Sequence, residues 1–327
     1  MNQKFCDFME NYRGQTLAVA VSGGVDSMCM MDWLAKMGMN IVCLHVNHGL
    51  RPTAGDEAAY VASVCKKMKI PCHIFNWTGT KPTHNLEHAA RDARYSMMIE
   101  FCHKNNIGTI CVAHQSDDQI ETFLMNLGRG SGLGGLAAMR PVHTRDGIRI
   151  IRPMLGVSRA EIKKYCDDNN IKYFMDEMND DPHYTRVRIR QNRHLLNDKL
   201  GISDARILLA IENLGRVRDI IESDVDTMVA NVMHDNYALF DASFLFDVGA
   251  DIRLKFVGTL IQRIGKNVYQ PRLNSLKIAL EKLQNDCKFT LGHCTIRRLG
   301  QRIIIVPEGS KTSFRKRHEK NKKRIQG

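Results

Sequence analysis

The sequence has no long apolar run and no closely spaced cysteine pair. No stretch approaches the roughly 20 consecutive apolar residues of a membrane-spanning helix, so we expect no membrane contact. The ten cysteines include no CxxC pair, which removes the commonest signatures of structural zinc and iron–sulfur sites. Scattered cysteines are typical of reduced thiols, and residues 1–7 lack the layout of a secretory signal. We therefore expect a cytoplasmic protein without a disulfide framework.

Positive charge is in excess, with a net charge of +12 and a sequence pI near 9.3. Residues 310–327 form a basic tail with a net charge of +7, from eight Lys or Arg and one Glu. Such a tail suits a polyanionic partner such as RNA. The alternative is a solvated terminus without a partner, because like-charged runs often bind nothing specific. Charge alone does not separate the two.

Strand-like and helix-like patterns alternate through the first part of the chain. The expected strands are residues 17–21, 41–46, 71–75, 109–113 and 148–151. Helical patterns lie between or after them, at 28–34, 54–69, 86–103, from 117, and at 158–169. This order predicts an α/β fold, in which a parallel sheet is covered by helices on both faces.

The character of the sequence changes after residue 198. Residues 204–232 and 251–285 have helical patterns, and residues 288–291, 294–297 and 302–306 read as strands of a small antiparallel sheet. We predict a catalytic domain at 1–198, a smaller helical or α+β domain at 199–309, and the basic tail at 310–327.

A small, glycine-rich motif directly follows the first expected strand and precedes a helical pattern. It consists of Ser22, Gly23, Gly24, Val25, Asp26 and Ser27. Glycines let the backbone approach a ligand, and free amides at a helix start attract phosphate oxygens. Asp26 is placed to hold a divalent cation against those phosphates. The alternative is a glycine turn in an ordinary crossover, but the full motif favours a phosphate site.

A second cluster follows the strand at 109–113. Asp117 and Glu121 are four residues apart and Asp118 and Glu121 three apart, so their carboxylates share one helix face. Such a face needs a cation, either a metal or an amine. The alternative is structural, with Ser116 capping the helix and acidic residues complementing its dipole.

Other candidates are less specific on their own. His114 is equally compatible with a core histidine, and Arg129 lies in a glycine-rich loop that suits phosphate contact or is merely a mobile surface loop. A run of arginines beside apolar residues predicts a phosphate-contacting stripe, with a solvated face as the alternative. The candidates for nucleic-acid contact are Arg94, Arg186, Arg188, Arg190 and Arg193.

Together, these motifs resemble the tRNA(Ile)-lysidine synthetase family of the PP-loop ATP pyrophosphatases. They occur in one order between residues 15 and 196: SGGVDS from 22, VNHGLR from 46, NLEHAARDARY from 85, AHQSDDQIET from 113, RGSGLGGL from 129, RPML from 152, Asp176, Asn179 and YTRVRIR from 184. Gln115 stands where the family usually has a second His, and Val187 where it usually has Asn.

The resemblance implies an adenine nucleotide α-hydrolase-like fold and ATP-dependent ligation of free lysine to C2 of the wobble cytidine of tRNA(Ile) with a CAU anticodon. An adenylated cytidine would be the intermediate, with AMP and pyrophosphate as products. The loop at 22–27 would bind ATP, with Asp26 on Mg²⁺. Recognition of lysine or catalysis would fall to Asp117, Asp118, Glu121, His114 and Arg129. A homodimer is the oligomeric form to test.

Two alternatives stay open. A tRNA thiolation enzyme of the same superfamily would need reactive cysteines, for which the possible pairs are Cys65 with Cys72 and Cys102 with Cys111. A non-catalytic RNA-binding protein is the other, although it would gain nothing from carboxylates that face RNA phosphates.

Overall fold

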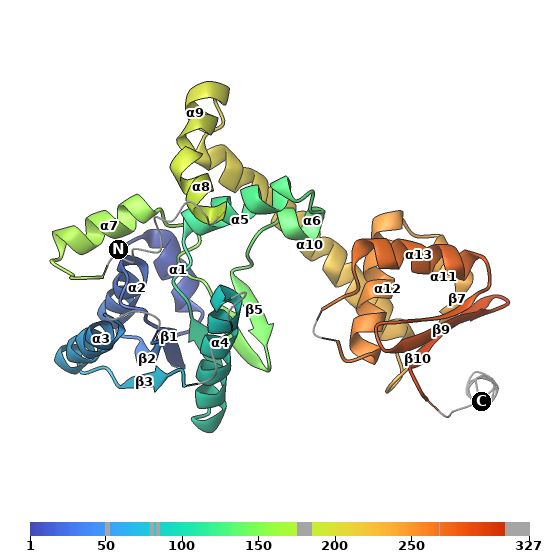
Figure 1. Cartoon of the computed structure of the whole chain (residues 1–327), viewed down its shortest axis with the longest axis horizontal. Coiled ribbons are helices and arrows are strands. Elements are labelled where there is room, and N and C mark those ends of the chain that lie inside the picture. The colour runs from blue at the N-terminus through green and yellow to red at the C-terminus, as the bar shows by residue number, and fades with distance from the viewer. Residues whose placement is uncertain (50–52, 79–81, 83–85, 175–184, 268, 311–327) are drawn as a thin grey trace. The chain divides into compact units, whose positions relative to one another are not determined.

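The computed structural model describes residues 1–49, 53–78, 82, 86–174, 185–267 and 269–310. The chain forms two compact units, Met1–Gly215 and Arg216–Gly327 (Figure 1). Helix α10 (Asp204–Val232) runs through the division between them. The domain boundaries at 198 and 309 stay predictions, and the basic residues of the tail from 311 on lie outside the described residues.

The first unit contains a six-stranded sheet in the order β3-β2-β1-β4-β6-β5. Five of these strands are parallel: β1 (Thr16–Ala20), β2 (Asn40–Asn47), β3 (Cys72–Asn76), β4 (Thr109–Cys111) and β6 (Ile148–Ile151). The edge strand β5 (Val142–Arg145) is antiparallel to β6 and was not anticipated. The strand order reverses direction between β1 and β4, and ligands in such sheets bind beyond the carboxyl ends at that point.

Alternate residues of the central strands enter two separate cores. Leu17 and Val19 of β1 pack in a core with α1 (Gln3–Glu10), α2 (Val25–Lys36), α3 (Ala54–Met68) and α7 (Arg159–Asp168). Ala18 of β1 and Leu44 of β2 pack on the other face, against α4 (Leu86–Lys104). This alternation places helices on both faces and confirms the predicted α/β fold.

The remaining helices of the first unit follow β4 or β6 in the sequence. They are α5 (Ser116–Gly128), α6 (Leu133–Leu136), α8 (Thr185–Asn192), α9 (His194–Leu200) and the start of α10. A small apolar cluster joins α5 to the start of α10 through Ile120, Ile207 and Ile211. The helix α8 packs against α5, which brings the arginine run beside the acidic cluster.

The second unit combines helices with a four-stranded antiparallel sheet, as predicted. Its elements are β7 (Ala238–Asp241), α11 (Ala242–Phe246), α12 (Ala250–Ile264), α13 (Leu273–Gln284), β8 (Lys288–Leu291), β9 (Cys294–Leu299) and β10 (Arg302–Pro307). The strand order is β7-β10-β9-β8, so β7 completes a sheet for which only three strands were anticipated.

The helical pattern at 251–285 proves to be two helices rather than one. Helix α12 ends at Ile264, and a Cβ at the following Gly265 would collide with the carbonyl oxygen of Gly292. The close approach of these two backbones therefore needs glycine and ends the helix. Within the described residues, no helix is long and apolar enough to cross a membrane.

Candidate active site

The glycine-rich motif forms the turn between β1 and α2. Gly23 has φ = +91°, which favours glycine, and Gly24 is the N-cap of α2 without a side-chain hydrogen bond. The Ser27 hydroxyl donates to the Gly24 carbonyl oxygen at 3.0 Å and accepts from the Ser22 amide at 3.2 Å. These bonds hold the turn, while the first amides of α2 have no side-chain cap. Such amides attract an anion.

Asp26 lies in the first turn of α2 and is mostly buried. Burial raises the pKa of this carboxyl to about 6; Arg159 opposes the shift, and the charges of Asp118 and Asp117 add to it. Among the described residues, its Oδ1 is buried without a hydrogen-bond partner. The two clusters therefore lie within electrostatic reach of each other. The buried Asp26 oxygen without a partner is a candidate ligand for a hard divalent cation such as Mg²⁺, and the two other carboxylates add negative charge around it.

The start of α5 is capped one residue earlier than expected. The Gln115 side-chain oxygen accepts from the Asp117 amide at 2.6 Å, and the Asp118 carboxylate accepts from the Gln115 amide at 2.9 Å. These two bonds form a capping box, so the cap is Gln115 and not Ser116, which the structural alternative had named. The structural interpretation of the acidic residues is thus correct in part, because Asp118 stabilises the helix start.

The cations that face the acidic cluster are arginines of the downstream run. Glu121 is fully buried, and its Oε1 accepts from Arg190 Nε at 2.8 Å. Its Oε2 is buried and has no partner within the described residues. Arg193 bridges the carboxylates of Asp117 and Asp204, each at 3.2 Å. Burial raises the pKa of Glu121, and the hydrogen bond from Arg190 opposes this shift.

The arginine run is therefore divided between two environments. Arg190 and Arg193 are paired with carboxylates, whereas Arg186 and Arg188 are exposed. Arg186 donates to the Thr122 hydroxyl at 3.4 Å, and Arg188 to the Thr185 hydroxyl at 3.1 Å. Val187 between them is buried, which explains an apolar residue at this position. The prediction of nucleic-acid contact suits the two exposed arginines best.

The motif residues Leu50, Arg51, Asp176, Asn179 and Tyr184 lie outside the described residues.

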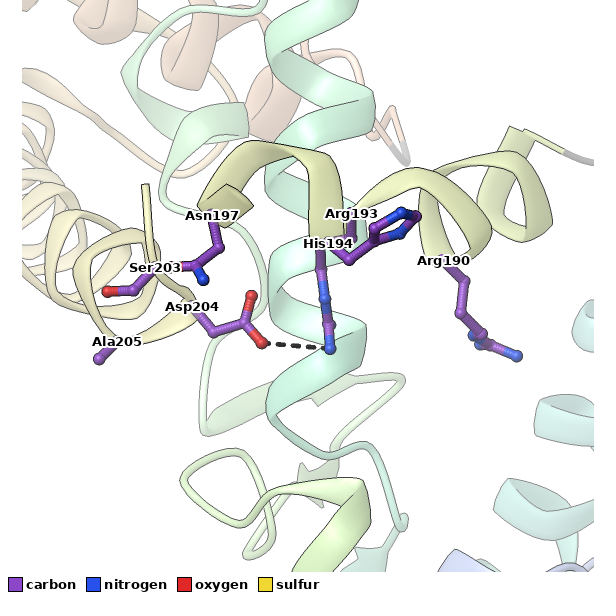
Figure 2. A pocket seen from close by; sticks show the side chains of 7 residues that line it. All are labelled: Arg190, Arg193, His194, Asn197, Ser203, Asp204 and Ala205. Carbon is purple, nitrogen blue, oxygen red and sulfur yellow. Dashed lines mark ion pairs between the residues drawn. The ribbon is translucent and has the colours of Figure 1, made fainter. Parts of the chain in front are cut away.

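A pocket of about 410 Å³ adjoins the paired arginines. It is lined by Arg190, Arg193, His194, Asn197, Ser203, Asp204 and Ala205. Figure 2 shows the Arg193–Asp204 ion pair inside it. Its lining contains side chains of both signs of charge, of which Arg193 and Asp204 are paired with each other.

A second charged group, largely missed by the sequence reasoning, surrounds His114 and Tyr95. Burial lowers the pKa of His114 well below its usual value, and the nearby charges of Arg152, Arg91 and Arg94 lower it further. Burial also lowers the pKa of Arg94 and of Arg152, although the nearby Tyr95 opposes both shifts. His114 is therefore a neutral imidazole among cations. This concentration of positive charge favours a bound anion.

The signal for Arg152 and Tyr95 was present in the sequence, because both lie in motifs of the family. The guanidinium groups of Arg91 and Arg94 lie 5.1 and 5.5 Å from the centre of the Tyr95 ring. Arg91 and Tyr95 are four residues apart on α4, so their spacing predicts this contact, but no local pattern places Arg152, which follows β6, beside Tyr95.

The structure does not bring Arg129 to these groups. It is the exposed C-cap residue of α5 and lies about 18 Å along the helix axis from Asp117, at 1.5 Å per residue. Its predicted phosphate contact stays a prediction.

The loop after β1, the carboxylates after β4 and the strand order between them define a class of enzyme that binds ATP through a pyrophosphate loop. A PP-loop domain model matches residues 1–197. The chain is 33% identical over 324 residues to the tRNA(Ile)-lysidine synthase of Wolbachia from Brugia malayi, covering 94% of this chain and 74% of the relative. The enzyme of that name from Wolbachia pipientis is 34% identical, covering 90% of this chain and 71% of the relative.

The chain belongs to the tRNA(Ile)-lysidine synthase family, and the prediction of an ATP-dependent ligase is confirmed. Among solved structures, a U34-tRNA thiolase from Methanococcus maripaludis with its iron–sulfur cluster superposes with a TM-score of 0.56. The superposition covers 65% of this chain and 78% of the thiolase, at 18% identity, and shows the shared fold alone.

Proposed function

We propose that this enzyme attaches free lysine to C2 of the wobble cytidine of tRNA(Ile) with a CAU anticodon. The cytosine C2 oxygen attacks the α-phosphorus of ATP and pyrophosphate leaves. The lysine ε-amine then attacks C2, AMP leaves with that oxygen, and the amine loses a proton. The observation that carries this proposal is the effect of Asp117 and Asp118 on Asp26, which indicates that the phosphate loop and the acidic cluster share one site.

The ATP phosphates are assigned to the loop at 22–27. The uncapped amides of α2 and the Ser22 hydroxyl would hold the phosphate oxygens. Mg²⁺ would be held by Asp26, and it supplies neutralisation of the charge on the leaving pyrophosphate. The positively charged group of Arg94, Arg152 and neutral His114 is available for a further phosphate contact.

The lysine amine is assigned to the acidic cluster. Asp117 is engaged by Arg193 and Asp118 by the helix cap, whereas Glu121 keeps one buried oxygen without a partner in the described part of the chain. A carboxylate whose pKa burial has raised is a stronger base than an exposed one. We therefore assign Oε2 of Glu121 as the acceptor of the lysine proton, with Asp117 and Asp118 as positioning residues.

The tRNA backbone is assigned to the exposed Arg186 and Arg188 and to the basic tail. Arginine contacts to phosphates position an RNA without reading its sequence. The wobble base must leave its stack to reach the phosphate loop.

The test is incorporation of labelled lysine into an unmodified isoleucine tRNA transcript with ATP and Mg²⁺. A matched transcript differs only in the wobble cytidine. We expect label, AMP and pyrophosphate with the cytidine alone. AMP without label would indicate that the nucleophile is a sulfur donor or an amine other than lysine. Label in both transcripts would refute the wobble cytidine as the modified base.

A further inference from the structure

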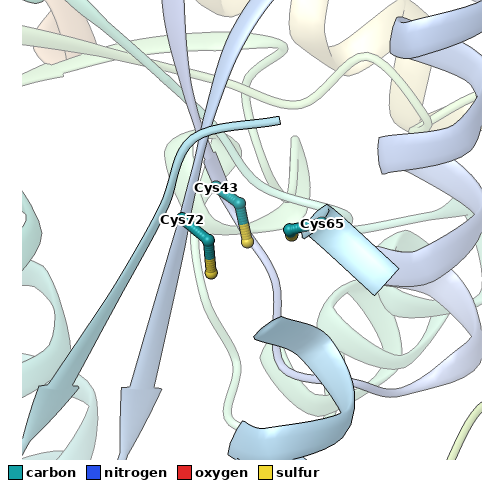
Figure 3. A group of neighbouring side chains, drawn as sticks. All are labelled: Cys43, Cys65 and Cys72. Atoms are coloured by element: carbon teal, nitrogen blue, oxygen red, sulfur yellow. The ribbon is translucent and has the colours of Figure 1, made fainter. Parts of the chain in front are cut away.

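Three cysteines that have no part in the proposed reaction lie together in the first unit. Cys43 is in the middle of β2, Cys65 in the last turn of α3 and Cys72 at the start of β3 (Figure 3). Their sulfur atoms all lie within 4.8 Å of one another. Rigid elements fix the group, because Cys43 and Cys72 are opposite each other in the parallel pair of β2 and β3.

The surroundings of the three sulfurs are soft and poorly hydrated. Cys43 and Cys65 are fully buried, and Cys72 is partly exposed. The thioether sulfur of the buried Met31 lies 3.7 Å from the Cys65 sulfur. Hydrogen bonds from the Cys43 and Cys65 thiols lower the pKa of Cys72. Thiolate and thioether ligands select soft metal ions.

We propose that Cys43, Cys65 and Cys72 bind a thiophilic metal ion of the Cu(I) or Zn²⁺ type, one per chain. Metal–sulfur bonds of ~2.3 Å place three trigonal sulfurs ~4 Å apart, so a side-chain adjustment below ~1 Å closes the site. Cys72 provides the approach from solvent, and the thioether of Met31 is a further sulfur beside Cys65.

The position of this ion separates it from the lysine ligation. Cys43 is opposite Val19 of β1, three residues before Ser22, which corresponds to ~10 Å along the strand. Cys72 begins β3, at the amino end of that strand. The ion therefore has a structural effect, in which it ties α3 to the sheet.

The experiment uses the full reduced chain, freed of metal, and titrates it with Cd²⁺ and then Zn²⁺ alone. Cd²⁺ reports on thiolates through its charge-transfer absorption. We expect one equivalent of tight binding and a higher melting temperature. The Cys65→Ser variant loses that equivalent. The matched control removes the more accessible thiols with Cys6→Ser and Cys287→Ser, and keeps it. Tight binding that persists in Cys65→Ser, or disappears in the control, overturns the proposal.

A second measurement avoids any substitution. One equivalent of Zn²⁺ should slow the alkylation of Cys72 at least tenfold and leave that of Cys287 unchanged. Equal rates with and without Zn²⁺, or recovery of a Cys43–Cys65 disulfide in place of the metal complex, overturns the proposal. Lysine ligation is not a readout in either experiment, so failure here leaves the proposed function untouched.

Discussion

Asp26 should make the protein less stable at the pH at which it works. Its carboxyl has a pKa of about 6 in the fold, against 3.8 as the reference value. The folded state therefore keeps this proton to a higher pH than the unfolded chain does. The resulting contribution to stability is present below pH 3.8 and is lost as the pH rises through about 6.

The Asp26→Asn substitution removes this dependence, because an amide does not ionise. A difference of about 2 pKa units corresponds to ~3 kcal/mol. We expect the variant to exceed the unsubstituted protein by up to ~3 kcal/mol in free energy of unfolding at about pH 8, and by much less at about pH 4. ATP cleavage should be abolished in the variant, since the amide does not replace the carboxylate at the cation.

The assay is urea unfolding of both proteins at the two pH values, without and with Mg²⁺ and ATP. Ligand binds the folded, unsubstituted protein and should reduce the difference at high pH. Asp168→Asn is the matched control, because Asp168 is exposed and its carboxylate pairs with Lys164 at 3.2 Å on the surface of α7. A difference that is the same at both pH values, or an Asp26→Asn variant that is less stable at about pH 8, would refute the reasoning.

Three further changes test separate parts of the site. Gln115→Ala removes the cap of α5 and should cost ~1 kcal/mol, read as a lower melting temperature; an unchanged value contradicts the capping role. Arg190→Ala leaves the buried Glu121 carboxylate without its partner and should lower the free energy of unfolding by ~3 kcal/mol. Arg188→Ala should change the free energy of unfolding by less than ~0.5 kcal/mol and weaken tRNA binding. Equal stability losses in the two variants would argue against the division of the arginine run. Removal of residues 311–327 should flatten the salt dependence of tRNA affinity and leave turnover at saturating tRNA unchanged, and an equal salt slope would reduce the tail to a solvated terminus.

Much of the fold was predictable because its signals are local. The apolar runs at 17–21 and 41–46 correspond to β1 and β2, and the motif after β1 carries its own turn chemistry. Strand β5 was missed since its four residues, Val142–Arg145, are mostly polar and exposed. The break after α12 was missed although its local signals are present, because Gly265 follows the last residue of the helix and Pro271 precedes α13.

The sequence predicts candidate residues for the site, but not how their side chains pair. The sequence indicates that the acidic face needs a cation and that the arginine run needs an anion. The two requirements meet in ion pairs, such as that between Glu121 and Arg190, which are 69 residues apart in the chain. The three cysteines were missed for the same reason. Their spacing in the sequence matches no known metal-ligand motif, and it is the pairing of β2 with β3 that brings Cys43 and Cys72 together.

The buried polar groups give an independent argument for where the site lies. Buried polar atoms in a fold are nearly always hydrogen-bonded, and each exception costs stability. Within the described residues, five of the predicted site residues carry a buried polar atom without a partner: Asp26, Arg94, His114, Glu121 and Arg193. Packing does not require this concentration, since apolar residues would fill the same volume at lower cost. A site that binds polar substrates accounts for it, because in the proposed reaction the substrates supply the missing partners.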